Sequence, residues 1–413
     1  MLYTSGEIRF GTRMNRIILI GNGFDLAHGY PTRYEDFINW YWNKRVDAFN
    51  GNLTSISEDC LCTIKMASKN TYNCWNVFAF NLPRFIHKLS GQEVIQSLKN
   101  ESELYEFTLS PFFKSICESI ETKGWVDIER AYYNHVKICL DTTKHSDNNN
   151  TISIEQLNHQ LEYLRNLLIE YLKSLQYYNR GNEDISNIIY GAFNPDDISV
   201  SSQDAYNAHC ENYGTLIPDG KDAEVKFGNK IFSNPCNVLL LNFNYTPIAI
   251  AYLLIQIEEL KYGGDIKAEM NFIHGDITKP RTLIFGYGDE LDDTYNSLLK
   301  IEENEYLRFI KSIKYLETDN YRKLLEFIES DCYQIYIMGH SCGNSDRTLL
   351  NTLFEHKNCV SIKPYYYQKA DGSDNYMEIV QNICRNFTDM KLMRDRVVNK
   401  TFCEPLPQIE PNE

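Results

Sequence analysis

Short apolar runs that end in glycine or asparagine constrain the fold of this chain more than any other feature. Such runs are typical of strands buried in a parallel sheet, because helices cover both faces of that sheet. Helical patterns over 247–260 and 346–356 follow two of them and start at Pro247 and Asp346. Strand, loop and helix in repetition predict an α/β fold with a doubly wound, mainly parallel, Rossmann-like sheet. The six runs are 16–20, 237–243, 271–273, 282–285, 334–338 and 360–364.

The interval 38–235 interrupts this rhythm between the first and second strands. Its patterns are aromatic-rich and largely helical, and apolar residues within 154–175 recur at helical spacing for about six turns. The polar segment 145–150 is typical of a turn-forming link. The expected units are an α/β core over 14–37 and 236–400, a large, mainly helical insertion over 38–235, and tails over 1–13 and 401–413.

Composition narrows the classes of function. The chain has 413 residues, with 41 Lys and Arg against 56 Asp and Glu, which gives a net charge of −15. A chain this acidic gains no counterion release from phosphate backbones, so general nucleic-acid binding is not expected. The hydrophobic content of 43% excludes bulk disorder and supplies material for a core.

The cysteines and the apolar segments indicate a compartment. Twelve cysteines are scattered along the chain without any Cys-x-x-Cys pair, and only Cys60 and Cys62 are close together. We therefore expect reduced thiols and no zinc. The N-terminus has only four consecutive apolar residues, too few for a signal peptide. The apolar run 238–257 contains two asparagines and a proline, which favours strand, loop and helix over a membrane span. These features predict a cytoplasmic protein without a membrane segment.

In a doubly wound sheet, ligands bind at the carboxyl ends of the strands, so the residues after each apolar run are candidates for a site. The first of these loops is Gly21-Asn22-Gly23-Phe24-Asp25. Gly21 and Gly23 permit a tight turn and close approach of backbone amides, and a helix N-terminus after them would suit a pyrophosphate. Gly-x-Gly by itself also fits a tight turn without a ligand.

Polar residues follow the later strands. Asn242 and Asn244 end the second strand, where asparagine is either a turn former or a ligand-facing amide, and we favour the ligand-facing role. His274 follows the third strand and is either structural or a catalytic base. Gly286 follows the fourth. The Gly- and Ser-rich loop after the fifth strand opens onto a helix and contains Gly339, Ser341 and Asp346.

The sequence Gly-His-Ser-Cys-Gly at 339–343 fits the Gly-x-Ser-x-Gly pattern of a nucleophile elbow between a strand and a helix. In hydrolases with this elbow, the acid and then the histidine follow the serine. Here only His356, inside the next expected helix, follows it. We therefore do not expect a serine hydrolase.

Six motifs resemble those of the AbiH family of bacteriophage abortive-infection proteins. The resemblance covers most of the chain from Met14 and implies a role in antiphage defence. In chain order, the motifs are GNGFDLAHGYPTRYEDF from Gly21, WVDIE from Trp125, LNFNYT from Leu241, IHGD from Ile273, IFGYGDE from Ile284 and GHSCGNSD from Gly339.

The same loops also resemble, more distantly, those of sirtuins and sirtuin-like NAD-consuming defence domains. Those proteins have a GAGxS loop that continues to GIP, a strand ending in TQNxD, a His-Gly pair, an FGE strand end and a late GTS loop. This resemblance implies a pocket in which NAD is bound, and in which it is cleaved with water as acceptor. The corresponding positions here are 21–25 with 29–31, 242–246, 274–275, 285–286 and 339–341.

The chain departs from the sirtuin pattern at several positions. Asp25, Phe243 and Thr246 replace a serine, a glutamine and an aspartate, and the aromatic-Arg pair that follows GIP is absent. The four-cysteine zinc ribbon, which would lie between His274 and Phe285, is missing. Its loss argues against deacylation, because the ribbon helps to shape the acyl-lysine cleft, and affects NAD hydrolysis less.

These resemblances imply that the chain hydrolyses NAD to nicotinamide and ADP-ribose. Asn244 would hydrogen-bond the ribose or the attacking water, and His274 would act as general base. The first loop would hold the pyrophosphate, with Asp25 on ribose hydroxyls, while Ser341 and Asp346 would reach the adenosine side. The expected cofactor-binding residues are Gly21, Asn22, Gly23, Phe24, Asp25, Asn242, Gly286, Gly339, Ser341 and Asp346.

Two other classes of function remain open. In the first, the same pocket senses NAD, ADP-ribose or a phage-triggered nucleotide, and the insertion relays the signal. In the second, the chain is an interaction protein without small-molecule chemistry, which leaves Asn244 and His274 without a role. A defence role implies a phage-derived trigger protein and a second copy of this chain as partners. Trp125 and Glu129 fit an insertion core residue and a helix-surface charge better than catalysis.

Overall fold

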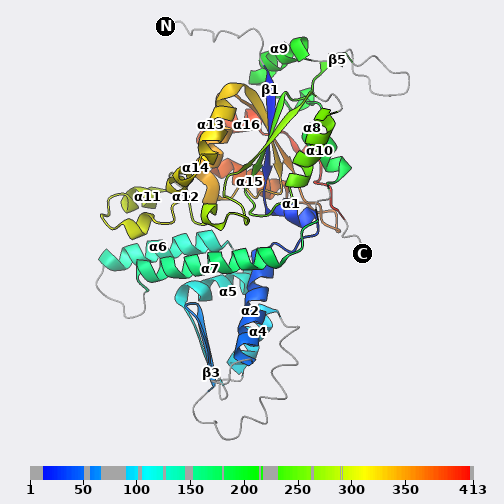
Figure 1. Ribbon diagram of the computed structural model, residues 1–413. Coiled ribbons are helices and arrows are strands. Elements are labelled where there is room, and N and C mark those ends of the chain that lie inside the picture. Colours follow the sequence, from blue (N-terminus) through cyan, green and yellow to red (C-terminus); the bar gives the residue numbers. More distant parts are fainter. Residues whose placement is uncertain are drawn as a thin grey trace.

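The computed structural model of the chain describes residues 13–50, 56–66, 90–100, 105–123, 127–144, 152–178, 181–213, 215–216, 231–261, 265–288, 290 and 292–409. Its largest sheet has five strands in the order β10-β9-β1-β7-β8, and every neighbouring pair is parallel (Figure 1). The doubly wound, mainly parallel sheet predicted from the sequence is therefore confirmed. The strands are β1 (Met14–Ile20), β7 (Asn237–Asn242), β8 (Lys267–Phe272), β9 (Cys332–Met338) and β10 (Cys359–Tyr365).

The strands read as continuous apolar runs because helices bury both faces of the sheet. Alternate residues of β1 face two separate cores: Ile17 and Leu19 lie in one, Ile18 and Ile20 in the other. Helices lie on both sides of the sheet in Figure 1. The first core contains α13 (Asn320–Ser330), α14 (Arg347–Phe354), α15 (Tyr376–Arg385) and α16 (Met390–Arg396). The second contains α1 (Asn22–Ala27), α8 (Glu183–Tyr190) and α10 (Ile250–Lys261).

The strand order places a topological switch point between β1 and β9. If β1, β7, β8, β9 and β10 are numbered 1 to 5, their order across the sheet from β8 to β10 is 3-2-1-4-5. The chain therefore first adds strands on one side of β1 and then on the other side. Ligands of doubly wound sheets bind outside the carboxyl ends of the strands at such a point. The carboxyl ends face α6 (Ile128–Lys144) and α7 (Ile154–Ser174) of the insertion, as Figure 1 shows.

The interval 38–235 contains helices and two small antiparallel sheets. The helix expected over 154–175 is confirmed as α7, whose first turn is closed by a capping box of Ser153 and Gln156. The expected link at 145–150 lies outside the described residues. The other elements are α2 (Tyr34–Asn50), α4 (Gly91–Asn100), α5 (Pro111–Lys123), α9 (Gln203–Tyr213), the sheet of β2 (Ile56–Glu58), β3 (Cys62–Met66) and β4 (Tyr105–Leu109), and the pair β5 (Thr215–Leu216) and β6 (Ile231–Phe232).

The insertion packs against the sheet through two separate hydrophobic clusters, one at each end of the strands. The largest cluster joins the helices of the insertion to residues that follow β8, among them Phe285, Tyr287 and Phe309. At the other end of the sheet, Phe193 and Ile198 pack with Met14 of β1. The insertion therefore contacts the sheet both at its carboxyl edge and at its amino edge.

The expected strand over 282–285 is not formed, which corrects the sequence prediction. Residues Pro280–Thr282 make a 3-10 turn, and the N–H of Ile284 donates to the carbonyl of His274, beyond the end of β8. Leu283 to Phe285 are buried without being in a strand. The run 282–285 is apolar because it is buried where the chain crosses between the carboxyl edge of the sheet and the insertion. Its apolar pattern therefore does not indicate a strand.

The apolar run 238–257 divides into β7, a turn and the start of α10, which begins at Ile250. Within the described parts of the chain, no helix combines the length and the apolar character needed to cross a membrane. The chain after α16 returns to the sheet: the N–H of Leu406 donates to the carbonyl of Tyr366, and that of Ile409 to Ala27.

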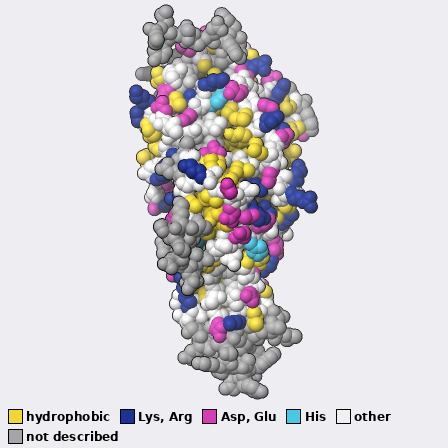
Figure 2. All heavy atoms as spheres, turned by 90° about the vertical axis from the view of Figure 1, so that its left-hand side faces the viewer, with side chains coloured by type: hydrophobic (Ala, Val, Ile, Leu, Met, Phe, Trp, Pro, Cys, Tyr) yellow, Lys and Arg dark blue, Asp and Glu magenta, His cyan; other side chains and the backbone are white. Residues whose placement is uncertain are grey.

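The side of the molecule that carries α11 (Asp293–Leu298) and α12 (Lys311–Lys314) is shown in Figure 2. Acidic and basic side chains are interspersed on this face, and apolar side chains form a band through its middle. Leu299, Ile313 and Leu316, exposed by 50%, 39% and 82%, lie on the chain between α11 and α13. Exposed apolar side chains that gather on one face form a surface to which another protein can bind.

Candidate functional site

A buried hydrogen-bond network joins the loop after β1 to the loop after β7. Oδ1 of Asp25 accepts from Nδ2 of Asn244 at 2.8 Å, and Oδ2 accepts from Oγ1 of Thr246 at 2.6 Å. The same Nδ2 of Asn244 donates to the carbonyl of Gly21 at 2.9 Å. Oδ1 of Asn242 accepts the backbone N–H of Asn244 at 2.9 Å. The structure thus brings together four predicted site residues, Gly21, Asp25, Asn242 and Asn244, and Thr246 joins them.

Asp25 is 1% exposed, and burial raises the pKa of its carboxyl to about 7, although the hydrogen bonds from Thr246 and Asn244 act in the opposite direction. The side-chain oxygen of Asn244 accepts no hydrogen bond from the described residues. A carboxyl that exchanges its proton near neutral pH therefore lies beside an amide oxygen that can still accept a bond from a ligand.

The glycine loop after β1 packs directly against the loop after β9. The N–H of Gly21 donates to the carbonyl of Met338 at 3.1 Å, and that of Gly23 to Gly339 at 2.8 Å. A Cβ on Gly23 would lie 2.7 Å from the Cα of Gly339. Gly339 itself has φ +73°, and its Cβ would meet the backbone nitrogen of Phe24 at 2.0 Å. The two amides predicted to hold a pyrophosphate are thus bonded to protein carbonyls in this structure.

The other residues of this loop have different surroundings. Asn22 is exposed, and its Oδ1 accepts from Oγ1 of Thr32 at 2.6 Å. Phe24 is fully buried, and its ring packs against His28 and Tyr252. Phe24 is therefore a core residue.

A second buried network is built from charged groups. Oδ1 of Asp346 lies 3.1 Å from Nε2 of His274 and 2.8 Å from Nζ of Lys311. The same Nζ lies 2.8 Å from Oε2 of Glu129. Nε2 of His274 is also 3.3 Å from the hydroxyl of Tyr315. One lysine therefore bridges two carboxylates, and one of these carboxylates contacts the predicted catalytic histidine.

The pKa values in this network follow from burial and from the shared lysine. Burial and the charge of Lys311 lower the pKa of His274. Burial disfavours the charged form of Asp346, yet Lys311 and His274 hold its pKa well below the usual range. Burial raises the pKa of Glu129, and Lys311 only partly offsets this effect. Lys311 is held charged, because its two carboxylate partners outweigh the effect of burial and raise its pKa. At neutral pH the network therefore contains a neutral imidazole beside an ionised Asp346.

Glycines of the IFGYGDE motif allow Lys311 to enter this network. A Cβ on Gly286 would lie 2.0 Å from the carbonyl oxygen of Phe309, and a Cβ on Gly288 would lie 3.0 Å from the Cβ of Lys311. The N–H of Gly286 donates to Oε1 of Glu129 at 3.1 Å. Gly286 was predicted to bind a cofactor; in this structure it binds the segment around Lys311 and holds Glu129.

One further prediction is overturned at this network. Glu129 was expected to be a helix-surface charge, but it is 7% exposed at the start of α6, and this expectation is wrong. Trp125 lies outside the described residues. Asp346 was expected to reach adenosine; in the structure it contacts His274 and Lys311.

The two predicted catalytic residues belong to separate networks. Asn244 contacts the loop after β1, whereas His274 contacts Asp346 and Tyr315. The ring of Phe243, the residue before Asn244, lies 5.1 Å from the imidazole of His274. The structure places the two side chains at neighbouring strand ends, without a shared hydrogen-bond partner among the described residues.

The loop after β9 does not have the geometry of a nucleophile elbow. Ser341 is exposed, and the non-glycine residue of this loop with positive φ is Cys342, at +53°. Cys342 is fully buried, and burial raises the pKa of its thiol. The sequence-based rejection of a serine hydrolase agrees with this arrangement, because neither residue combines access with an adjacent base.

Sequence analysis missed Lys311, Tyr315 and His340. Nε2 of His340 lies 3.6 Å from Oδ2 of Asp346, so this histidine borders the network as well. His340 stands inside a motif and could have been considered. Lys311 belongs to no motif, and Lys314 one turn later forms a surface ion pair with Glu317. No local signal distinguishes these two lysines.

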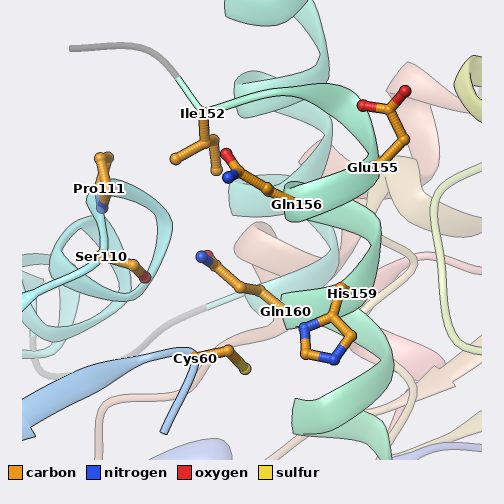
Figure 3. A pocket seen from close by; sticks show the side chains of 8 residues that line it. All are labelled: Cys60, Ser110, Pro111, Ile152, Glu155, Gln156, His159 and Gln160. Atoms are coloured by element: carbon orange, nitrogen blue, oxygen red, sulfur yellow. The ribbon is translucent and has the colours of Figure 1, made fainter.

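Two cavities have linings that include neither His274 nor Asn244. A groove of about 560 Å³ lies in the insertion, and Figure 3 shows Gln156 and Gln160 of α7 pointing toward Ser110 across it. A smaller cavity of about 80 Å³ is bordered by Tyr245 and Asp276 beside the loops after β7 and β8. Within the described ranges, no three His, Cys, Asp or Glu side chains are grouped so that they could hold a metal ion.

The family model for bacteriophage abortive infection AbiH matches residues 17–367. No curated protein and no solved structure matches the chain. The resemblance to sirtuin-like domains gains no support from these comparisons. The family match covers all six motifs, including those that form the two buried networks. The chain therefore belongs to the bacteriophage abortive infection AbiH family.

Proposed function

We propose that this chain acts in abortive infection by hydrolysing NAD to nicotinamide and ADP-ribose at the carboxyl edge of its sheet. Family membership supports the defence role. The contact of His274 with Asp346 carries the enzymatic part of the proposal. An ionised carboxylate only accepts hydrogen bonds, so Nε2 of His274 bears the proton and Nδ1 carries a lone pair. Nδ1 has no hydrogen-bond partner among the described residues, which leaves it available as a general base.

The reaction breaks the bond between C1′ of the ribose and the nicotinamide nitrogen. The electron pair of this bond moves to the pyridinium nitrogen, which leaves as neutral nicotinamide. A water oxygen bonds to C1′, and its proton passes to Nδ1 of His274. Asn244 and Asp25 would hold the ribose hydroxyls from the other network.

The charges around His274 suit a cationic transition state. Asp127 and Glu129 at the start of α6, together with Asp346, place three carboxyl groups around Lys311. Such an excess of acidic groups favours positive charge that develops on the sugar, and it disfavours a phosphate at this position. We therefore expect the pyrophosphate to lie near the loop after β1, away from Asp346.

The alternative is a sensor that binds NAD, ADP-ribose or another nucleotide without consuming it. One observation favours it: the loops after β1 and β9 are closed against each other by the hydrogen bonds of Gly21 and Gly23. A ligand that separates these loops would change the surface that faces the insertion.

The experiment is incubation of the purified chain with NAD, followed by chromatography for nicotinamide and ADP-ribose. We expect His274→Ala and Asn244→Ala to abolish cleavage while circular dichroism shows an intact fold. His356→Ala is the matched control, because His356 also contacts a carboxylate, Glu329 at 3.2 Å, but lies at the amino ends of β9 and β10. A folded variant that cleaves NAD at the parental rate would remove the role assigned to its residue.

Calorimetric titration of ADP-ribose separates the enzyme from the sensor. If the chain is an enzyme, Asn244→Ala binds ADP-ribose and no longer cleaves NAD. If the chain is a sensor, both the parent and Asn244→Ala bind ADP-ribose, and neither cleaves NAD, even with phage lysate. Gly23→Val is unsuitable for this purpose, because its side chain would collide with Gly339 and disturb the loop packing. Absence of binding by the parent chain would favour an interaction protein.

We further propose a cytoplasmic location and a phage-derived trigger protein as partner. The exposed Leu299, Ile313 and Leu316 between α11 and α13, and the apolar band in Figure 2, support a protein contact on the side that carries α11 and α12. A second copy of the chain would fit the same surface. Light scattering of the purified chain, with and without phage lysate, tests whether the chain forms an oligomer.

A further inference from the structure

Lys311 carries a buried ammonium group where the insertion meets the strand-end loops. It is 1% exposed, and Nζ contacts Asp346 and Glu129 at 2.8 Å each. The oxygen of Asp346 that binds Lys311 also lies 3.1 Å from Nε2 of His274. The ammonium group is therefore within about 6 Å of the imidazole nitrogen, with no other charged group between them than the shared carboxylate.

The backbone around Lys311 is built to bring it to this position. Tyr287 and Ile310 form an isolated parallel bridge, and the N–H of Lys311 donates to the carbonyl of Tyr287 at 2.9 Å. Gly286 and Gly288 permit this close approach, because a Cβ at either position would press on the opposite segment. Burial of a lysine is unfavourable unless it is paired, so the arrangement requires a compensating interaction.

We propose that Lys311 is a positioning residue for the general base, which it keeps neutral through its contact with Asp346. Glu129 holds Lys311 in place from α6, so the insertion supplies part of the site. This inference rests on the proposed function, because it takes His274 as the base. An imidazole must be neutral to accept a proton, and a nearby cation disfavours the imidazolium form.

Several elements contribute titratable groups that act on His274 itself or on its partner Asp346. Removal of the Lys311 side chain takes away the ammonium charge that acts on His274. The set consists of His340 and Asp346 from the loop after β9, Lys311 and Tyr315 from the segment of α12, Asp127 and Glu129 from the start of α6, Tyr34 from α2 and Tyr245 from the loop after β7.

The test is the protonation state of His274 in Lys311→Met, measured by ¹⁵N NMR of labelled imidazole between pH 5 and 9. We expect the parent to show the neutral Nε2–H tautomer at pH 7. In Lys311→Met, the pKa of His274 should rise by about two units, as unit charges about 6 Å apart imply. The acid limb of the pH profile for NAD cleavage should move upward by the same amount, with activity regained at high pH.

A second variant allows the test even if Lys311→Met does not fold. Lys311→Met leaves two buried carboxylates without a cation, whereas Lys311→Met combined with Glu129→Gln removes the buried pair together. We expect the double variant to fold and to raise the pKa of His274 by about one unit. Glu129→Gln alone should leave His274 neutral at pH 7, because Lys311 keeps its contact with Asp346.

The matched control is the buried pair of Lys363 and Asp197, whose side chains are 4% and 0% exposed and lie 3.1 Å apart. Lys363→Met combined with Asp197→Asn removes a similar pair, between β10 and the 3-10 turn Pro195–Asp197, and should leave the titration of His274 unchanged. An unchanged titration of His274 in the folded Lys311 variants would overturn the inference. NAD cleavage by the parent together with that result would leave the proposed function standing. Absence of cleavage with a shifted titration would refute the proposed function, and with it the role of His274 as the base, while the effect of Lys311 on the protonation of His274 would stand.

Discussion

Asp25→Asn tests whether the carboxyl at the end of β1 is neutral in the folded protein. Asp25 is 1% exposed, accepts two hydrogen bonds from neutral donors and has no ion-pair partner among the described residues. Burial raises its pKa from 3.8 to about 7. A group whose pKa is raised on folding stabilises the protein fully below its unfolded pKa, and this stabilisation is lost as the pH rises through the folded pKa.

The difference of about 3 pKa units corresponds to about 4 kcal/mol, of which roughly 2.5 kcal/mol is lost between pH 5 and pH 8. Asparagine has the same shape but does not ionise. Its oxygen can accept from Asn244, and its amide can donate to the hydroxyl of Thr246. The free energy of unfolding of Asp25→Asn, relative to the parent, should therefore rise by about 2.5 kcal/mol from pH 5 to pH 8.

Urea unfolding followed by circular dichroism at pH 5 and pH 8 measures this difference. Asp184→Asn, which removes an exposed carboxylate from α8, controls for the change in net charge. Parallel pH dependences of the parent and Asp25→Asn would refute the reasoning. They would mean that the hydrogen bonds from Asn244 and Thr246 outweigh burial and keep the carboxyl ionised.

Two further predictions concern the packing that positions the site. Gly339→Ala should lower the thermal unfolding midpoint far more than Gly372→Ala. Both glycines have positive φ, but a Cβ at Gly372 meets nothing within 4 Å, so that variant reports the backbone penalty alone, about 1 kcal/mol. Equal losses would show that the two loops can separate easily. Arg16→Met should destabilise the fold by about 3 kcal/mol in urea, because Arg16 is fully buried and donates to carbonyls of Ile189 and Gly191 at 2.9 and 2.7 Å. Full stability in Arg16→Met would mean that water replaces these bonds.

Much of the fold could be predicted because burial on both faces of a parallel sheet leaves a local mark in the sequence. The runs at 16–20, 334–338 and 360–364 correspond to β1, β9 and β10 within two residues at each end. The helix α7 was predictable for the same reason, since its apolar residues recur with the helical period. The run at 282–285 was misread because a buried crossing segment and a buried strand have the same apolar pattern.

The candidate site was predictable only as a set of loops. A glycine or a histidine after an apolar run indicates the carboxyl edge of the sheet, and this reasoning found Asn244, His274 and Asp346. It did not predict the partners of these side chains within the protein, because hydrogen bonds between loops depend on strand order, and no local pattern specifies strand order. The loops after β1 and β9 are in contact because these two strands are neighbours in the sheet, although more than 300 residues separate them along the chain.

The sequence by itself determined which segments are buried, where they end and which loops carry polar groups, since these properties depend on neighbouring residues. Tertiary structure decided which charges meet. Glu129 and Lys311 are 182 positions apart and lie in segments whose local patterns resemble surface helices. Only the docking of α6 against the segment held by Gly286 and Gly288 removes both side chains from water. Glu129 and Lys311 then pair because a buried charge without a partner would be strongly unfavourable.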